Sequence, residues 1–206
     1  AERTGGSSLR RTWELVTGDR DLQRFLIVRS LLLVTALSTP FIVVLGSQQG
    51  ADLTGLGAFV IASGGASLLG GRVSGALSDR SSKSTMAWAA GFASTVLILL
   101  VFSASLFDAH VNAWVMPLGF FLVNLAHTAV RVSRKTYLVD MADGDRRTLI
   151  TGASNTVMGV VLLAVGAVSS AVSLLGPQAA LIFLAVIGYA GVAGAARLKD
   201  VSATRG

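Results

Sequence analysis

The sequence alternates long apolar runs with short connections, and this pattern restricts the fold more than any other feature. Each run is long enough to cross a hydrocarbon core of about 30 Å as a helix that rises about 1.5 Å per residue. The six runs span about residues 25–45, 53–77, 86–107, 114–139, 149–174 and 179–196. The composition agrees, because 52% of the residues are hydrophobic and only 14% are charged. The sequence therefore predicts an all-α polytopic membrane protein with six transmembrane helices.

Basic residues are distributed unevenly between the two sides of this predicted bundle. All 17 Lys and Arg residues except Arg29 lie in, or beside, the segments on one side: the N-terminal segment, 71–85, 131–147 and the C-terminal tail. The connections on the other side, 46–52, 108–112 and 176–178, contain none. Since cytoplasmic loops carry an excess of Lys and Arg, both termini are expected to be cytoplasmic. We expect a cytoplasmic linker with an interfacial segment at 1–21, a transmembrane domain at 22–198 and a cytoplasmic tail at 199–206, in a prokaryotic inner membrane.

Composition also removes several classes of function. The net charge of +6 does not indicate nucleic-acid binding, because the basic residues sit at the ends of apolar runs and form no single stripe. The chain has no cysteine, and its histidines, His110 and His127, are too isolated to suggest a metal site, so no cofactor is expected. The spans hold no acidic residue and no recognisable catalytic grouping, which makes a membrane-embedded enzyme the least favoured class. The chain begins with Ala and without a signal-peptide pattern, so we expect a fragment of a longer protein.

A charged segment separates the second and third runs: Gly71-Arg-Val-Ser-Gly-Ala-Leu-Ser-Asp-Arg-Ser-Ser-Lys83. A connection this short predicts a tight helical hairpin. Gly71 and Gly75 are four residues apart and would leave a flat helix face for close approach of a neighbour. Asp79 would face the positive N-terminus of another helix, while Arg80 and Lys83 suit lipid headgroups or an acidic partner. The other interpretation is an ordinary basic hairpin held on the cytoplasmic side by charge asymmetry.

The part Gly75-Ala-Leu-Ser-Asp-Arg-Ser-Ser-Lys83 resembles the cytoplasmic loop signature of the major facilitator superfamily, which joins the second and third helices of each six-helix half. Ser82 and Ser84 depart from the glycine and the basic residue that are usual there. The resemblance implies the C-terminal half of a transporter, whose partner is the missing N-terminal six-helix half. It also implies secondary active transport of a small-molecule solute by alternating access, coupled to protons. In the family this loop docks against the opposite half and locks the cytoplasmic side.

The fourth run carries polar residues at steps of three or four, which places them on one helix face. These residues are Asn124, His127, Arg131, Arg134 and Lys135. Because lipid exposure of such a stripe is costly, it should face a bundle interior, a water-filled cavity or the headgroups. Arg134 and Lys135 lie near the end of the run and can snorkel to the headgroups. For His127 two interpretations are open, a buried hydrogen-bonded side chain and a proton carrier.

Arg29 lies about one turn inside the first run. It either snorkels to the cytoplasmic surface or lines a cavity with Arg131 as a site for an anionic group. The resemblance implies the second, because the first and fourth helices of each half line the central cavity in that superfamily. Segment 131–147 also looks like the charged connection between the fourth and fifth helices of such transporters. There we expect a charge network that closes the cytoplasmic side, with solvated loop charge as the alternative; its members are Arg134, Lys135, Asp140, Arg146 and Arg147.

Two functions therefore remain open from the sequence. One is transport, which a cavity lined by Arg29, His127 and Arg131 would favour. The other is a non-transporting membrane scaffold or assembly factor with a transporter-like fold, which headgroup anchoring of the same three residues would favour. Glycines on the second, fifth and sixth runs, including Gly188, Gly191 and Gly194, predict close helix packing under either function.

Overall fold

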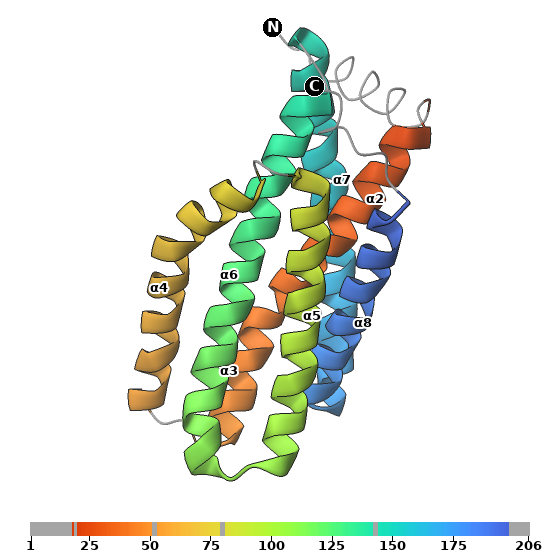
Figure 1. Cartoon of the computed structure of the whole chain (residues 1–206). Helices are drawn as coiled ribbons and strands as arrows, with labels where there is room; N and C mark the ends of the chain where they lie inside the picture. The colour runs from red at the N-terminus through yellow and green to blue at the C-terminus, as the bar shows by residue number, and fades with distance from the viewer. Residues whose placement is uncertain (1–17, 19, 51–52, 79–80, 142–143, 198–206) are drawn as a thin grey trace, which may run out of the picture.

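The computed structural model describes residues 18, 20–50, 53–78, 81–141 and 144–197, and within them the chain forms helices and turns without a strand. Figure 1 shows the helices running up and down in one bundle. In chain order they are α2 (Arg20–Val34), the 3₁₀ turn η1 (Thr35–Ser38), α3 (Thr39–Gln48), α4 (Leu53–Ser78), α5 (Ser82–Leu106), α6 (Ala109–Met141), α7 (Gly144–Val172), the 3₁₀ turn η2 (Ser173–Leu175) and α8 (Pro177–Ala195).

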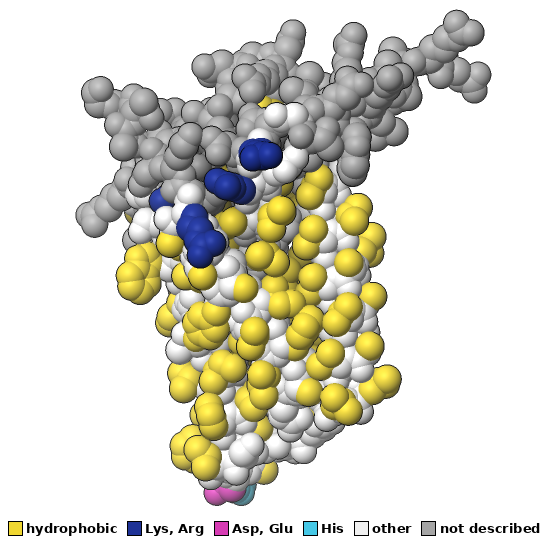
Figure 2. All heavy atoms as spheres, turned by 90° about the vertical axis from the view of Figure 1, so that its right-hand side faces the viewer, with side chains coloured by type: hydrophobic (Ala, Val, Ile, Leu, Met, Phe, Trp, Pro, Cys, Tyr) yellow, Lys and Arg dark blue, Asp and Glu magenta, His cyan; other side chains and the backbone are white. Residues whose placement is uncertain are grey.

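The prediction of six apolar spans is confirmed. Six helical segments are long and apolar enough to cross a membrane when α2, η1 and α3 are counted as one span, Gln23–Gln48. Successive spans are joined at alternate ends of the bundle (Figure 1). We call the end where α2 begins and α8 ends the charged end. Figure 2 shows why: on the face it displays, Lys and Arg gather at that end above a wall of hydrophobic side chains. By helix length and composition, the chain is an integral membrane protein.

Several helices begin earlier along the chain than their apolar runs predict, and α6 and α7 each begin about five residues earlier. The predicted turn at 108–112 is mostly helical, because the Asp108 carboxylate caps α6 and its Oδ1 accepts a hydrogen bond from the Val111 N–H at 3.0 Å. At the charged end, α6 continues to Met141 and α7 begins at Gly144, so most of the connection expected at 140–147 is helical as well. Polar residues in the sequence therefore show where an apolar run ends, but the helix can continue beyond that point.

An early start of α6 places Asn112 inside the protein at the end opposite the charged end. Its Nδ2 donates to Gln49 Oε1 at 3.0 Å and to the Phe107 carbonyl at 2.9 Å. Ser103 Oγ donates to Asn112 Oδ1 at 2.5 Å. Asn112 is fully buried, and these bonds satisfy its amide group, which would destabilise an apolar core if it were left without partners. One side chain of α6 thus ties together α3, α5 and the turn before α6.

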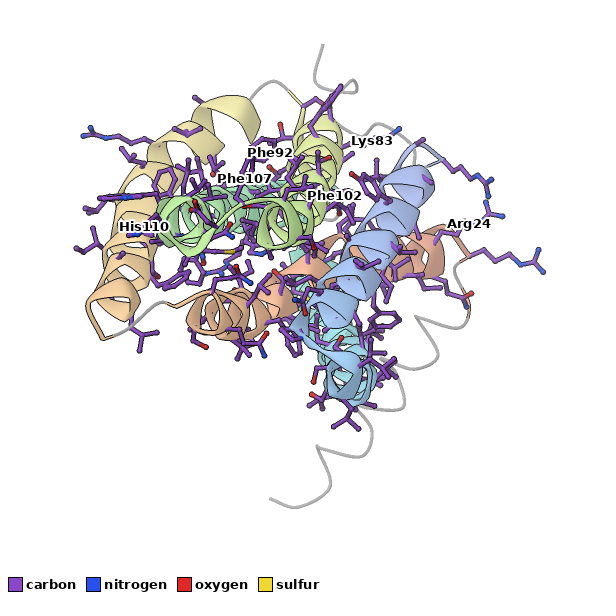
Figure 3. The ribbon with its side chains drawn as sticks, turned by 90° about the horizontal axis from the view of Figure 1, so that it is seen from below. Arg24, Lys83, Phe92, Phe102, Phe107 and His110 are labelled. Atoms are coloured by element: carbon purple, nitrogen blue, oxygen red, sulfur yellow. The ribbon has the colours of Figure 1, made fainter. Side chains whose placement is uncertain are left out.

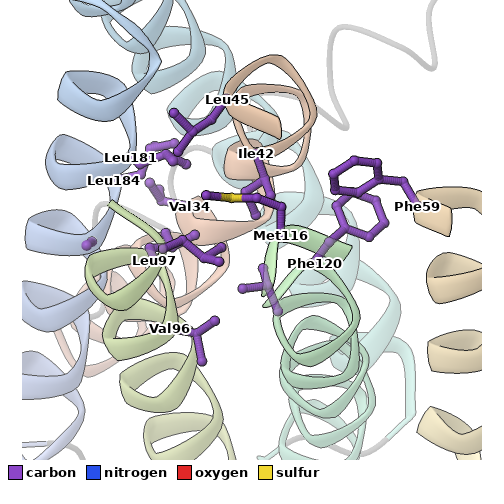
Figure 4. Close-up of a cluster of buried hydrophobic side chains, with 13 residues drawn as sticks. Val34, Ile42, Leu45, Phe59, Val96, Leu97, Met116, Phe120, Leu181 and Leu184 are labelled. Carbon is purple, nitrogen blue, oxygen red and sulfur yellow. The ribbon is translucent and has the colours of Figure 1, made fainter. Parts of the chain in front are cut away.

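The core consists of two buried apolar clusters, one near the charged end and one in the other half of the bundle. The first gathers Phe25, Leu26, Leu32, Met86, Val130 and Ile150, among others. The second, shown in Figure 4, includes Ile42, Leu45, Leu97, Met116, Leu181 and Leu184. At its edge Phe59 of α4 meets Phe120 of α6 edge to face, with 5.2 Å between ring centroids. α6 packs against both α4 and α5, and α8 packs against α5 and α2.

Close packing of α8 against the first span depends on its glycines. A Cβ atom added at Gly191 would lie 3.0 Å from the Leu32 backbone nitrogen, and one at Gly194 would lie 2.8 Å from Val28 Cγ2. Gly188 sits in the same row, against Thr35 and Ser94. The prediction that small residues on this helix allow close packing is therefore confirmed.

α4 and α7 are covered far less than the other helices. Only 17% of the apolar window in Gly55–Ala76 and 6% of that in Ile150–Leu175 is buried. Most buried residues of α7 are near the charged end, where Ile150 joins the first core cluster, and Ser169 is buried near the other end. Most of both helices therefore faces outward.

Candidate functional site

The first span is interrupted near its middle by the 3₁₀ turn η1. Pro40 lacks an N–H group and cannot donate to the carbonyl of Ala36, one helical turn earlier. Side chains supply the missing donors instead: Thr39 Oγ1 donates to the Ala36 carbonyl at 3.2 Å, and Ser38 Oγ donates to the Thr35 carbonyl at 2.6 Å. The break is thus built into the sequence Thr35-Ala-Leu-Ser-Thr-Pro40.

This break is deep inside the protein. Thr35 and Ser38 are both 0% exposed, and they lie near the middle of the span Gln23–Gln48. The Thr35 hydroxyl makes no hydrogen bond within the part of the chain that the structure describes. Interrupted helices near the middle of a membrane are where transport proteins place their binding sites, because the irregular backbone offers polar groups there.

His127 of α6 faces the break. Its side chain is 3% exposed, and the imidazole lies against the backbone of Thr35. Neither ring nitrogen makes a well-formed hydrogen bond to any described residue. The histidine is buried, as one of the two interpretations of the sequence expects. Its function as a proton carrier stays a prediction.

Arg29 of α2 is also inside the bundle. It is 2% exposed, and its guanidinium carbon lies 5.9 Å from the centre of the Phe25 ring, a cation–π contact one turn toward the charged end. The arginine therefore extends toward the charged end through the protein interior and not along the lipid-facing surface. Arg131, which the sequence pairs with it in a cavity, lies on α6 one turn beyond His127 and is exposed.

α7 contributes a further buried polar group, Ser154. It is 1% exposed, and its hydroxyl has no hydrogen-bond partner among the described residues. It lies on the short part of α7 that is buried, and α7 packs mainly against α2. We call four buried polar side chains the polar core: His127 of α6 and Thr35 of η1, which lie against each other, and Arg29 and Ser154 of the neighbouring helices α2 and α7.

Two members of the polar core, Thr35 and Ser154, are not among the residues that the sequence pattern indicates. A usable signal existed for the first, since Ser38, Thr39 and Pro40 interrupt an otherwise apolar run and mark a break just before the proline. Asn124, by contrast, was a candidate and is half-buried, but its amide donates to the Phe120 carbonyl of its own helix at 2.9 Å.

The expected hairpin around 71–83 takes a different form. The connection is short, but α4 and α5 barely touch, because they diverge from the charged end and α6 packs against both (Figure 1). A Cβ at Gly71 or Gly75 would meet no atom within 4 Å, whereas one at Gly70 would lie 2.7 Å from Thr128 Cγ2. The close contact to a neighbouring helix is therefore made at Gly70, and the face of Gly71 and Gly75 is open.

The remaining charged candidates lie at the same end. Lys83 is half-buried in the first turn of α5, which Ser81 caps by accepting the Ser84 N–H at 3.3 Å. Asp79 and Arg80 lie outside the described residues. The other five occupy helical positions in α6 and α7, but their side chains are not among those described, so the predicted charge network stays a prediction; they are Arg134, Lys135, Asp140, Arg146 and Arg147.

A cavity of about 450 Å³ opens between α4, α5 and α6 near the charged end. Its walls are apolar side chains such as Trp88 and Phe92, together with hydroxyl groups that include Ser74 and Thr85. The residues that line it do not include Arg29, His127 or Arg131. The cavity between α4, α5 and α6 is thus separate from the polar core.

No group of His, Asp or Glu residues that could hold a metal ion occurs in the described part of the chain. Compared with family models, with curated proteins and with solved structures, the chain matches none of them.

Proposed function

We propose that this chain is the C-terminal half of a secondary transporter of the major facilitator type, which moves a small solute by alternating access coupled to protons. The observation that carries the proposal is the buried break in the first span with His127 of the fourth span facing it. In transporters, solute and coupling ion bind near the bilayer midplane beside discontinuous helices. The break at Thr35, near the middle of the span Gln23–Gln48, supports the proposal for this reason.

Electrostatics links the proton to the solute in this arrangement. A proton on His127 adds positive charge to a buried site that has Arg131 one turn away. Such charge is costly in an apolar interior unless water or an anionic group enters. Protonation therefore favours a conformation in which the polar core is open to water or to a solute carrying a carboxylate. Because the proton and the solute both favour the open conformation, binding of one increases the affinity for the other.

The exposure of α4 and α7 supports the proposal that a second six-helix half packs against this chain. Glycines recur every seven residues on α4 at 57, 64 and 71, and a Cβ at any of them would meet no atom within 4 Å. Gly152 and Gly159 of α7 are equally open. Small residues let transmembrane helices approach closely and slide. The two least covered helices thus carry flat faces suited to a second six-helix half, and the bilayer covers the rest of the bundle.

Transport is tested with the full-length protein in vesicles that contain a trapped pH-sensitive dye. Sugars, amino acids, carboxylic acids and organic cations are added one class at a time, and solute-dependent proton movement is recorded. We expect one class to move protons with the wild-type protein and His127→Gln to abolish that movement. His110→Gln is the matched control, because His110 is the other histidine and is exposed at the opposite end of α6. Equal activity of both variants would remove the proton-carrier function of His127.

A scaffold or assembly factor is the second candidate. It is favoured by the separation of Arg29 and His127 from the cavity between α4, α5 and α6, because neither side chain lines that cavity. Under this alternative the polar core stabilises a fixed helix arrangement, and no solute class moves protons with the wild-type protein.

A further inference from the structure

A second pocket, unrelated to the polar core, lies between α2 and α8 at the charged end. It has a volume of about 300 Å³ and is lined by Arg24, Ile27, Val28, Gly194 and Arg197. Arg24 is in the second turn of α2. Arg197 follows the end of α8, where its backbone N–H donates to the Gly194 carbonyl at 3.1 Å. Arginines from two helices that are far apart in sequence therefore converge on one small groove.

The floor of this groove is apolar and shaped by a glycine. α8 and α2 approach so closely here that a Cβ at Gly194 would lie 2.8 Å from Val28 Cγ2. Beside that contact Ile27 is 55% exposed on the outer surface of α2. The groove thus combines a cationic mouth with an apolar side formed by Ile27 and Val28.

Both arginines are placed at the boundary of the membrane. Arg24 is the second residue of the span Gln23–Gln48, and Arg197 follows the last residue of the span Pro177–Ala195 by two. Both side chains are exposed, and Figure 3 shows Arg24 extending outward from the bundle. None of the described residues that line the groove is acidic. The described lining residues therefore place two positive charges at the depth of the lipid headgroups.

We propose that this groove binds an anionic phospholipid, with Arg24 and Arg197 on the headgroup phosphate and an acyl chain against Ile27. Guanidinium groups bind phosphate oxygens through paired, charge-assisted hydrogen bonds, which suits two arginines that face one headgroup. A free phosphate ion would use the same two arginines, but it would leave the apolar side of the groove unoccupied. The site does not depend on transport and applies equally to a scaffold.

The test is a lipid competition measured by native mass spectrometry. The purified chain is equilibrated with equal amounts of phosphatidylglycerol and phosphatidylcholine, and the retained lipid is counted. Each basic residue near the surface contributes a few-fold preference, so the two arginines together predict about a 30-fold preference for phosphatidylglycerol, equivalent to about 2 kcal/mol. Arg24→Gln/Arg197→Gln should remove that preference. Arg72→Gln is the matched control, because Arg72 is an exposed arginine near the charged end of α4, outside the groove.

Several outcomes decide between this site and its alternatives. Loss of the preference in the double variant, with retention in Arg72→Gln, would support the lipid site. Equal loss in both would reveal diffuse attraction to a basic surface and overturn it. Displacement of the lipid by inorganic phosphate at matched concentration would assign the groove to a free anion and also overturn it. If the double variant does not fold, Arg197→Gln alone decides, with about a fivefold loss expected and no loss refuting the proposal.

Discussion

Gly188→Ala is the most direct test of how closely α8 must approach the break in the first span. The added Cβ would overlap Ser94 Oγ and would lie 2.6 Å from Thr35 Cγ2. Both neighbours are 0% exposed, and Ser94 is held by a hydrogen bond from its Oγ to the Ala90 carbonyl at 2.9 Å. The added methyl therefore requires a rotation of Ser94 that breaks this bond, a rotation of Thr35, or a shift of α8 away from Thr35.

The magnitude follows from two opposing terms. Alanine is favoured over glycine inside a helix by about 1 kcal/mol, whereas overpacking of a well-packed core costs about 1–3 kcal/mol. Because the contacts are so short, we take the upper end of that range and expect a net loss of about 2 kcal/mol for Gly188→Ala. Gly159→Ala is the matched control: its Cβ meets no atom within 4 Å, so only the favourable term of about 1 kcal/mol applies.

Thermal unfolding of the purified protein in one detergent provides the assay. A change of 1 kcal/mol moves the unfolding midpoint of a chain of this size by about 2–4 °C. We therefore expect Gly188→Ala to unfold about 4–8 °C below wild type and Gly159→Ala to unfold about 2–4 °C above it. Equal midpoints for the two variants would refute the close contact between α8 and Thr35, and with it the position of the break.

Three other substitutions test separate parts of the structure. Asn112→Leu should lower the free energy of unfolding by about 1–3 kcal/mol, because it leaves the buried Ser103 hydroxyl without its acceptor; an unchanged chemical denaturation midpoint would contradict this. Pro40→Ala restores an N–H that can donate to the Ala36 carbonyl, so it should raise the thermal midpoint and slow vesicle transport, and faster transport would contradict a hinge at the break. Asp79→Asn should slow transport turnover without lowering expression or the thermal midpoint, and wild-type turnover would remove the gating function of the loop.

The sequence was sufficient to predict the spans and their alternation, because apolar length and the distribution of Lys and Arg determine both. It was insufficient where helices extend beyond apolar residues. Asn112 was assigned to a turn because a polar residue next to Asp108 resembles a loop, whereas the Asp108 carboxylate caps a helix that includes it. Hydropathy cannot distinguish these cases, since both contain the same residues.

The candidate site was predictable only in part. His127 and Arg29 stand out because polar residues inside apolar runs are rare, and the structure places both in the interior. Thr35 could not be predicted as a site residue, because threonine is common in membrane helices and only the break in the backbone distinguishes this one. The choice between Gly70 and Gly71 also required the structure, because sequence spacing gives a helix face but not the neighbour that packs on it.

The central claim is that solute and proton pass through the polar core. The most direct test measures whether water reaches this region. The chain contains no cysteine, so single cysteines can be placed at positions 35 and 127 of the full-length protein in its membrane. A membrane-impermeant thiol reagent is then applied, with position 131 on the exposed part of α6 as the positive control and position 32 in the apolar core as the negative control. The account predicts labelling at 35 and 127 that changes when a transported solute is added, and none at 32. Labelling at 131 alone, under every condition, would show a sealed helix interface and contradict transport through the polar core.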